Sequence, residues 1–357
     1  MPKDVKYIKN TSMTHRFSIK ELALQARLST ATVDRVINNR ANVSPQTRRR
    51  VDAAFKELED QETQLSARGR RLFIDIIVEA PTRFSREVKI ACNDVITGLS
   101  PAVFRPRFHL GPKFDEQEIM QLLGSIKKRG SHGVIIAAQE RASVRKLINE
   151  LIDNGIPVLA FVTDQPATKR LAYVGIDNFQ AGKTAAYLMN KLLFKPDARI
   201  LATIRRSNFS GEDQRLEGFQ ASLNHSKPNA NLIIAMGGDG LSVDTSDEVK
   251  NALKGVKQID AVYSMGGGNE AIIKTLHDYQ FNPKIYIAHD LDEENIALLH
   301  AEKITAVIHH DVAQDLRNAF TQIAAFHKLI PPFQNQLHSD IQIITPLNLP
   351  NRVQNLP

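Results

Sequence analysis

The chain lacks the features that mark secreted, disulfide-bonded or membrane proteins. Cys92 is the single cysteine among 357 residues, so internal disulfides and cysteine-based zinc sites are excluded. We expect Cys92 to be a small, half-buried side chain. No run of about 18 apolar residues is present, as a membrane-spanning helix would require. Segment 1–17 is basic and polar and lacks the apolar stretch of a secretory signal. These absences favour a cytoplasmic protein with no membrane partner.

Motifs for common catalytic chemistries are also missing. The chain has no G-x-S-x-G elbow. The segment "AGKT" at 181–184 ends like a phosphate-binding loop, but that motif requires glycine where Asp177 stands. We interpret "GGDG" at 237–240 as a polar turn after a strand. His309 and His310 are adjacent, and neighbours in a strand point to opposite faces, so both cannot bind one metal ion. We therefore expect no enzymatic activity, no cofactor and no metal.

Charge is distributed unevenly along the chain. The formal net charge is +7, from 46 basic and 39 acidic side chains. Within residues 1–71 lie 15 of the basic side chains but only 8 of the acidic ones, so the rest of the chain is balanced. A basic N-terminal segment on a neutral body indicates that this segment contacts a polyanion.

Helix-start signals divide residues 17–60 into three helices. Ser18 opens the first in a capping box with Glu21, Ser29 caps the second, and Ser44 precedes the proline that starts the third. Two short helices joined by a few residues, with a third packed beneath, have the spacing of a helix-turn-helix unit. The segment is therefore predicted to be a small all-α DNA-binding domain.

The second helix has one core face and one face suited to a DNA groove. At about 100° per residue, Val33, Val36 and Ile37 gather on the core side. On the opposite side Arg35 can donate two hydrogen bonds to guanine, and the small Ala31 lets the backbone approach the bases. The residues that we assign to DNA contact on this helix are Ser29, Thr30, Ala31, Thr32, Arg35 and Asn38.

Asp34 lies on one flank of that surface. An unpaired carboxylate near phosphates lowers DNA affinity, so we favour a structural role in which Asp34 pairs with a neighbouring basic residue such as Arg27. The alternative is that Asp34 accepts a hydrogen bond from a cytosine amino group.

The run "FSIKELALQARLSTATVDRVINNRANVSPQTRRRVDAAFKELE" resembles the DNA-binding head of the lac-repressor/galactose-repressor family. The resemblance rests on A-T-V-x-R-V-x-N, on V-S and on T-R-x-x-V, all in register over about 40 residues. It implies a homodimer that binds a two-fold site on double-stranded DNA.

Residues 61–71 correspond to the hinge of that family, and residues 1–16 to a flexible tail. The linker "EDQETQLSARGRR" is shorter than usual and lacks the Pro-Asn that commonly precedes the hinge helix. Family hinge helices insert a leucine into the minor groove. The resemblance places Leu65 or Ala67 there, and leaves open whether this hinge is helical and bends DNA.

From residue 72 to 357 short apolar runs alternate with helical stretches, which predicts parallel sheets covered by helices. Nearly 290 residues of this pattern are too many for one small sheet, so we expect two similar lobes. The runs are "FIDIIVEA", "GVIIAA", "IPVLAFV", "LAYVGI", "RILATI", "NLIIAM", "AVYSM", "KIYIAH" and "TAVIHH". The segments "YVGIDNFQAGKTAAYLM" and "DQRLEGFQASL" resemble type I periplasmic sugar-binding proteins, as the effector domains of the same family do. The fold class is thus α/β, a two-lobed periplasmic-binding-protein-like domain preceded by the helix-turn-helix head.

The resemblance also implies an effector site at the carboxyl ends of the strands, where open α/β folds bind ligands. Carboxylates and an arginine suit the hydroxyls of a polyol, and an aromatic face covers its apolar side. Backbone N–H groups of the glycine run 266–268 offer an additional site for a hydroxyl or an anion. The effector is therefore a sugar, a sugar phosphate or a sugar acid. The matching positions are Phe84 in the first loop, Asp164, Arg215, Asp290 and His310.

Together these features predict a dimeric, ligand-responsive transcriptional regulator, a repressor of carbohydrate uptake or catabolism genes. One alternative is a sugar-modifying enzyme with an appended basic head, which would need an acid-base pair or a phosphate loop. The other is a solute-binding receptor, which the patterned basic head argues against.

Overall fold

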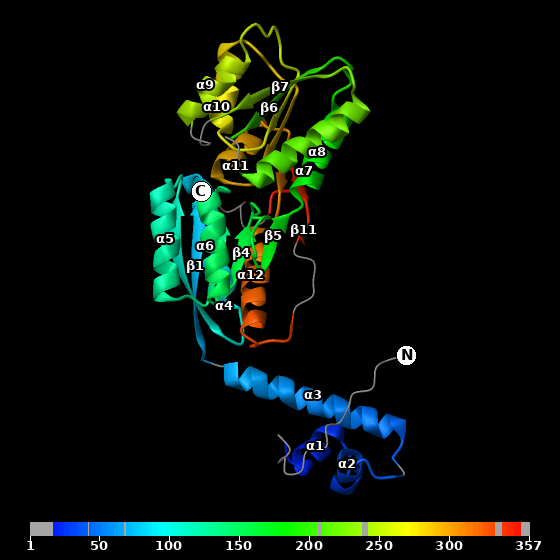
Figure 1. The fold of residues 1–357 in the computed structure, drawn as a ribbon. Helices are drawn as coiled ribbons and strands as arrows, with labels where there is room; N and C mark the ends of the chain where they lie inside the picture. Colours follow the sequence, from blue (N-terminus) through cyan, green and yellow to red (C-terminus); the bar gives the residue numbers. More distant parts are fainter. Residues whose placement is uncertain are drawn as a thin grey trace.

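We describe the protein from a computed structural model, over residues 17–41, 43–67, 69–205, 209–237, 242–332 and 338–350. The segment 1–16, expected to be a flexible tail, lies outside these ranges. Figure 1 shows a small helical head, followed by two stacked α/β lobes. None of the helices in the described ranges combines the length and apolar character of a membrane span.

The head consists of the three predicted helices, α1 (Ile19–Ala26), α2 (Thr30–Ile37) and α3 (Pro45–Ala67). Their inward faces form one small core, in which the rings of Phe17 and Phe55 meet edge to face at 5.4 Å. The capping box at the start of α1 and the N-cap of α2 are both formed. The capping and proline signals in the sequence thus predicted the three helices of the head correctly.

Helix α3 is longer than the sequence suggested. It continues to Ala67, so the expected boundary at residue 60 falls inside a helix and residues 61–67 are helical. The segment contains no glycine or proline before Gly69, so nothing in it stops the helix. Leu65 lies in this last part of α3, and its side chain is outside the described part of the structure.

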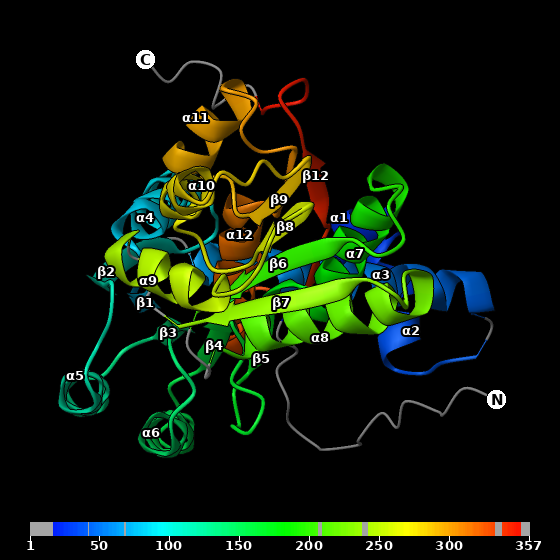
Figure 2. The same ribbon diagram turned by 90° about the horizontal axis from the view of Figure 1, so that it is seen from above.

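Each lobe is a six-stranded sheet with helices on its faces, as Figures 1 and 2 show. The strand orders are β11-β5-β4-β3-β1-β2 in lobe 1 and β12-β10-β9-β8-β6-β7 in lobe 2. All pairings are parallel except that of β12 with β10. The elements of lobe 1 are β1 (Arg71–Glu79), α4 (Thr82–Thr97), β2 (Val103–Gly111), α5 (Glu116–Arg129), β3 (Gly133–Ala137), α6 (Ala142–Asp153), β4 (Val158–Phe161), β5 (Ala172–Ile176), α12 (Val312–Phe326) and β11 (His338–Ser339). Those of lobe 2 are α7 (Asn178–Leu192), β6 (Arg199–Ile204), α8 (Ser210–Ser226), β7 (Asn231–Met236), α9 (Ser242–Ala252), β8 (Ala261–Ser264), α10 (Asn269–Asp278), β9 (Ile285–His289), α11 (Glu293–His300), β10 (Ala306–His309) and β12 (Gln342–Ile344).

All nine strands predicted from apolar runs are present, but β2 and the two short strands β11 and β12 were missed. The longest of these is β2. Its sequence, "VFRPRFHLG", alternates apolar with basic residues and contains Pro106. A proline is tolerated only where its missing N–H faces no partner, and β2 is an edge strand that pairs with β1 alone.

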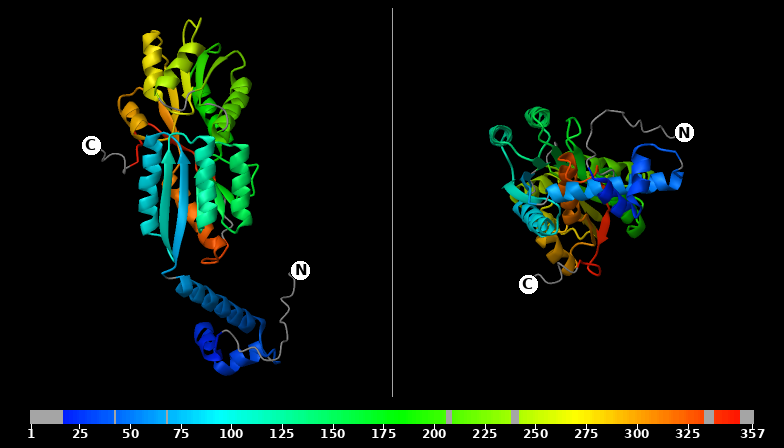
Figure 3. Two further views of the ribbon diagram at one scale, coloured as in Figure 1. Left: turned by 60° about the vertical axis from the view of Figure 1, so that its left-hand side comes forward. Right: turned by 90° about the horizontal axis from the view of Figure 1, so that it is seen from below.

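The chain crosses between the lobes three times, and the left view of Figure 3 shows the two lobes one above the other, with the head below them. The crossovers lie between Ile176 and Asn178, between His309 and Val312, and between Ser339 and Gln342. These short connections are the covalent hinge of the body.

Helices α7 and α8 pack against each other at glycine positions. A Cβ atom added to Gly182 of α7 would lie 2.0 Å from the carbonyl oxygen of Arg215, and one on Gly218 of α8 would lie 2.0 Å from that of Phe179. Only residues without a side chain allow this approach. The two glycines therefore fix the position of the backbone that carries Arg215.

Candidate DNA-contacting helix and effector cleft

Helix α2 presents the surface that the sequence predicts. Val33 and Val36 are buried, while Ala31, Arg35 and Asn38 are exposed. The Arg35 side chain has no hydrogen-bond or ion-pair partner among the described residues, so its guanidinium is available to a ligand.

The start of α2 is fixed by its own side chains. The Ser29 hydroxyl accepts a hydrogen bond from the Thr32 backbone N–H at 3.1 Å, and the two hydroxyls lie 2.8 Å apart. Thr30, between them, is exposed. Ser29 and Thr32 thus hold the helix end in place, beside the exposed residues assigned to DNA.

Asp34 forms an intramolecular network at the other end of α2. Asn38 Nδ2 donates to Asp34 Oδ1 at 2.7 Å and to the Asp34 carbonyl at 3.0 Å, and Arg40 Nη1 lies 3.1 Å from Asp34 Oδ2. The partner is therefore Arg40, not the expected Arg27, which ends α1 in a left-handed conformation. Because both amide hydrogens of Asn38 are used within the helix, its Oδ1 acceptor is the atom left for DNA.

Replacing Asp34 by serine should change affinity for DNA by less than about 1 kcal/mol and leave base preference intact, because an exposed ion pair contributes little. Selection of sites from random double-stranded DNA, run on both proteins, measures the base preference. The matched control is Asp94→Ser, which removes an exposed carboxylate from α4 in the body. Loss of preference at one base pair in the Asp34→Ser protein alone would instead mean that Asp34 reads cytosine.

A cavity of about 70 Å³ lies between the lobes, at the carboxyl ends of their strands. It has room for several water molecules. Its wall combines charged, aromatic and aliphatic side chains: Glu79, Ala80, Pro81, Arg83, Phe84, Ala137, Val162, Thr163, Arg205, Phe209, Gly211, Glu212, Arg215, Met265, Gly266, Gly267, His289, Asp290 and Asp292.

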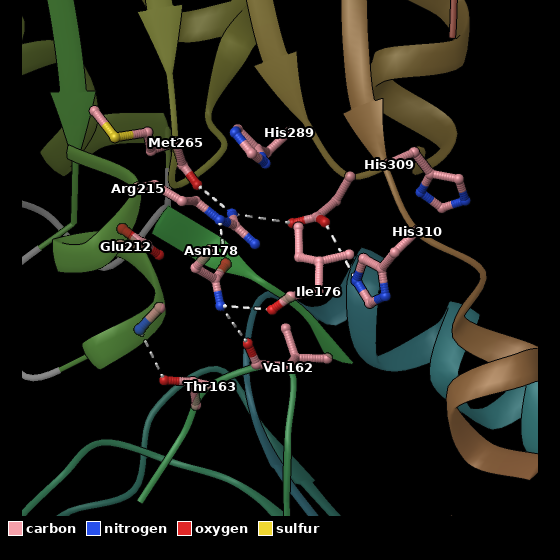
Figure 4. Close-up of polar contacts among 12 residues, drawn as sticks. Val162, Thr163, Ile176, Asn178, Glu212, Arg215, Met265, His289, His309 and His310 are labelled. Carbon is pink, nitrogen blue, oxygen red and sulfur yellow. Dashed lines mark hydrogen bonds and ion pairs between the residues drawn. The ribbon is translucent and has the colours of Figure 1, made fainter. Parts of the chain in front are cut away.

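Arg215 is the most firmly held cation of this wall. It is 3% exposed, and its Nε donates to Asn178 Oδ1 at 2.7 Å. Its Nη1 donates to the Met265 carbonyl at 3.1 Å and lies 3.8 Å from Asp290 Oδ2. Figure 4 shows the guanidinium between Asn178 and Met265. Such a group is oriented before a ligand arrives, which lowers the entropic cost of binding.

Two residues of the wall have unusual backbone conformations at corresponding places in the lobes. Val162 follows β4 with φ of 63°, and Asp290 follows β9 with φ of 64°. Their backbone N–H groups donate to Val174 and Ile308 on the neighbouring strands. A left-handed conformation is rare for a β-branched residue, and such strain concentrates at binding sites. The two strand ends are therefore shaped to line the cavity.

The lobes also meet through ion pairs beside the cavity. Arg83 of α4 pairs with Asp292 and, at 3.0 Å, with Glu294, and Arg86 pairs with Glu293 at 2.8 Å. Burial raises the pKa of Asp292 to about 6, although Arg83 beside it acts in the opposite direction. These contacts join the first turns of α4 and α11 across the cleft.

Gly267 allows Arg83 to lie across the loop after β8. A Cβ atom at this position would lie 2.3 Å from Arg83 Nη2, and the φ of Gly267 is 84°. The glycine run therefore serves the packing of an arginine here.

Arg205 of the wall is already paired with a carboxylate. It forms an ion pair with Glu212, and its guanidinium lies 4.2 Å from the ring centre of Phe209. Glu79 accepts from Arg141 at 2.9 Å. The charges around the cavity are thus largely balanced within the protein.

The structure brings three of the five predicted effector residues to the cavity. Phe84, Arg215 and Asp290 line it, although Phe84 lies in the first turn of α4 and not in a loop. His310 contacts Asp290 from behind, with Nε2 3.7 Å from Oδ1. Asp164 lies outside the wall, because both of its carboxylate oxygens are bound by Arg170. Thr163, one residue earlier, lines the cavity in its place.

Sequence reasoning missed several residues of the wall. Arg83 adjoins Phe84 in "PTRFS", Glu212 precedes Arg215 by one helical turn, and Asp292 follows Asp290 by two residues. Their closeness in sequence to the predicted residues could have identified them, because residues one helical turn apart, or at the end of one strand, lie on the same surface.

The motifs set aside earlier have ordinary structural roles. Residues 181–184 lie inside α7, which Asp177 caps, so they form no loop. Of "GGDG", only Gly237 lies in the described ranges. His309 and His310 diverge, as Figure 4 shows. In the described part of the chain no three His, Cys, Asp or Glu side chains are grouped as a metal site requires.

Comparison with family models gives two matches. Residues 18–59 match the model of bacterial regulatory proteins of the lacI family. Residues 112–327 match the model of the periplasmic binding protein domain. The junction of head and body lies between the two matched regions.

Individual proteins are similar to the same parts of the chain. Catabolite control protein A of Staphylococcus epidermidis is 24% identical over 343 residues, 91% of this chain and 87% of that protein. The sucrose operon repressor of Pediococcus pentosaceus is 26% identical over 211 residues, 57% of this chain and 60% of that protein. Among solved structures, the glucose-galactose binding protein GanP of Geobacillus stearothermophilus matches with a TM-score of 0.69 and 18% identity, over 79% of this chain and 99% of that one. This last likeness shows the fold of the body.

Proposed function

This chain belongs to the family of periplasmic binding protein domains, joined here to a head of the lacI family of bacterial regulatory proteins, and we propose that it is a sugar-responsive repressor of carbohydrate genes. It acts in the cytoplasm as a homodimer, binds a two-fold operator through paired α2 helices, and carries out no catalysis. The names of a catabolite control protein and a sucrose operon repressor among its relatives support the link to carbohydrate genes.

The observation that carries this proposal is the presence of two ready binding surfaces in one chain. Arg35 stands exposed on a capped helix of a basic head, and Arg215 stands oriented in a cavity between two lobes. The first suits base edges in a major groove, and the second suits a small polyol.

The charge balance of the cavity favours an uncharged sugar over a sugar phosphate or a sugar acid. Arg83 and Arg205 are each paired with protein carboxylates, and Arg215 lies near Asp290. An anion would have to displace one of these carboxylates, whereas hydroxyls can donate to the carboxylates and accept from the arginines. Phe84 and Phe209 add apolar surface for the face of a sugar ring.

The coupling between the two surfaces follows from the cleft. An effector that binds between the lobes changes their relative orientation, and the change reaches the heads through the dimer. The effector alters operator affinity only as far as its own affinity differs between the two states.

Two other functions account for less of the structure. A sugar-modifying enzyme would need a general acid and base placed for reaction, but the cavity carboxylates near arginines are held in ion pairs. A solute receptor would have no use for a helix-turn-helix head.

The test is selection of binding sites by the full chain from random double-stranded DNA, followed by release from the selected site. We expect a two-fold symmetric site, and release by one sugar in a panel of D-glucose, D-galactose, L-arabinose, sucrose and trehalose. Mass spectrometry of small molecules that co-purify with the protein extends the panel. Recovery of no symmetric site would contradict the proposal.

A further inference from the structure

The three crossovers between the lobes are linked by buried polar side chains. Asn178 ends the first crossover, His310 lies in the second, and Ser339 begins the third. Asn178 and His310 are 2% and 1% exposed. Since lobe movements pass through these segments, contacts between them bear directly on regulation.

The links run through the effector cavity. Arg215 Nε donates to Asn178 Oδ1 at 2.7 Å, and its Nη1 lies 3.8 Å from Asp290 Oδ2. Asp290 Oδ1 lies 3.7 Å from His310 Nε2. Figure 4 shows Arg215, Asn178 and His310 around this centre.

Beyond the cavity the chain of contacts continues into lobe 1. His310 Nδ1 is hydrogen-bonded to Asp315 Oδ2, and the Ser339 hydroxyl donates to Asp315 Oδ1. Asp315, in the first turn of α12, is fully buried. It does not line the cavity but fixes the ring of His310, which faces Asp290 with its other nitrogen.

One contact is missing from this series of hydrogen bonds and ion pairs, between Asp290 and His310. Asp290 Oδ1 and His310 Nε2 are both buried, and neither has a hydrogen-bond partner in the described residues. Their separation of 3.7 Å is too long for a direct hydrogen bond. One hydroxyl oxygen, about 2.8 Å from each atom, would accept from His310 and donate to Asp290.

Charge favours the protonated form of His310. The two nearby carboxylates, Asp290 and Asp315, face one guanidinium, Arg215, so a second positive charge balances the group. Burial opposes this charge, but the hydrogen bond and charge of Asp315, with the charge of Asp290, raise the pKa of His310.

Several other ionisable groups lie near these charges. Burial raises the pKa of Asp292 to about 6 and raises the pKa of the Tyr173 and Tyr263 hydroxyls, so both tyrosines stay neutral. Two histidines are also neighbours. Burial, with the charges of Arg215 and His310, lowers the pKa of His289 well below its usual value, so His289 stays neutral. The His309 ring lies 5.9 Å from that of His310, and its Nδ1 accepts a hydrogen bond from the Leu291 backbone N–H at 3.2 Å.

We propose that Asp315 is a positioning residue for the effector: it holds the ring of His310 with Nε2 aimed at Asp290, so that an effector hydroxyl placed between them joins all three crossovers. The inference rests on the proposed function, because it assumes a hydroxylated effector in this cavity.

A pH dependence follows. The folded-state pKa of His310 is raised, so its charge is present at low pH and is lost as pH rises through that value. In Asp315→Asn the pKa of His310 falls, so the charge is lost at lower pH. We expect sugar affinity of this variant to be about tenfold weaker at neutral pH and to recover near pH 5.5, because one charge-assisted hydrogen bond contributes about a factor of ten.

The experiment uses the full chain, calorimetry with the sugars D-glucose, D-galactose, L-arabinose, sucrose and trehalose between about pH 5.5 and pH 8, and NMR titration of labelled histidines. The matched control is Asp311→Asn, which removes an exposed carboxylate four residues away and keeps a good N-cap. His310→Gln keeps an amide donor that does not titrate, so it should lose the pH dependence that His310 contributes to sugar affinity and keep only that of other wall groups such as Asp292. Thermal unfolding identifies any variant that is merely unstable.

A loss of affinity in Asp315→Asn that is equal at all pH values would overturn the proposal, as would a wild-type His310 that titrates at or below the usual histidine value. The test of the proposed regulatory function gives a separate result from the test of Asp315. If no operator is found but the pH profiles agree, the regulator assignment fails and the role of Asp315 stands.

Discussion

Replacing Arg215 by alanine should lower sugar affinity at least tenfold and leave operator binding without sugar intact. The guanidinium is buried, oriented by Asn178 and the Met265 carbonyl, and lies beside Asp290. A charge-assisted hydrogen bond contributes about 1.5–3 kcal/mol, and every 1.4 kcal/mol is about a factor of ten. Calorimetry with the sugar that releases the operator measures the first effect, and operator binding measures the second.

The same substitution should also reduce stability, because it leaves Asn178 and Asp290 without their cation. Loss of one partner of a buried ion pair costs about 3–5 kcal/mol. Asp290 is partly exposed, with 26% of its side chain accessible, so we expect about 3 kcal/mol or less. Denaturant unfolding checks this value, and thermal unfolding identifies a temperature at which the variant is folded.

Two further variants separate binding from folding. Arg215→Lys keeps the charge but loses the planar fork, so it should retain more stability than alanine yet still bind sugar weakly. Arg317→Ala removes an exposed arginine from α12 and should change neither property. If Arg215→Ala binds the sugar as tightly as the wild type, the effector cavity has been located wrongly.

The sequence identified the elements of this fold better than it identified their partners. Apolar runs located nine strands, because buried parallel strands are apolar on both faces. The edge strand β2 was not predicted, because its alternating basic residues and Pro106 interrupt any apolar run.

Site residues were predictable where a strand end dictates their position. Asp290, which follows β9, reached the cavity, whereas Arg215 reached it from inside helix α8. Asp164 did not reach it, because Arg170, six residues later, binds its carboxylate. The sequence shows that a carboxylate follows a strand, but not which cation it will face.

Contacts between distant segments were beyond sequence reasoning. The pair of Arg83 with Asp292 joins residues on different lobes, and the pair of His310 with Asp315 depends on how α12 begins. Only the packing of the crossovers brings these groups together. The contacts that connect the lobes are thus among the parts of the site that sequence reasoning missed.

Replacing Arg35 by alanine should weaken operator binding by about 2–6 kcal/mol per dimer, because each of two heads loses a base contact of about 1–3 kcal/mol. Arg35 is exposed on α2, and the described residues offer it no partner, so the variant should fold normally. Binding curves for the selected operator, measured over a range of salt concentrations, check the prediction.

The salt dependence tells a base contact from a phosphate contact. The wild-type protein should bind steeply less well as salt increases, with a logarithmic slope of about 0.9 for each phosphate neutralised. A base contact contributes specificity, so Arg35→Ala should keep that slope and lose preference at one base pair of each half-site. A phosphate contact would lower the slope by about one per head and leave preference unchanged.

The matched control is Arg49→Ala, which removes an equally exposed arginine from α3 of the same head. It lowers the net charge by the same amount, so any loss that it causes should be uniform across DNA sequences. Arg35→Ala should differ from it in base preference as well as in affinity. Unchanged binding by Arg35→Ala, or association that is insensitive to salt, would remove α2 from its role as the DNA-reading helix.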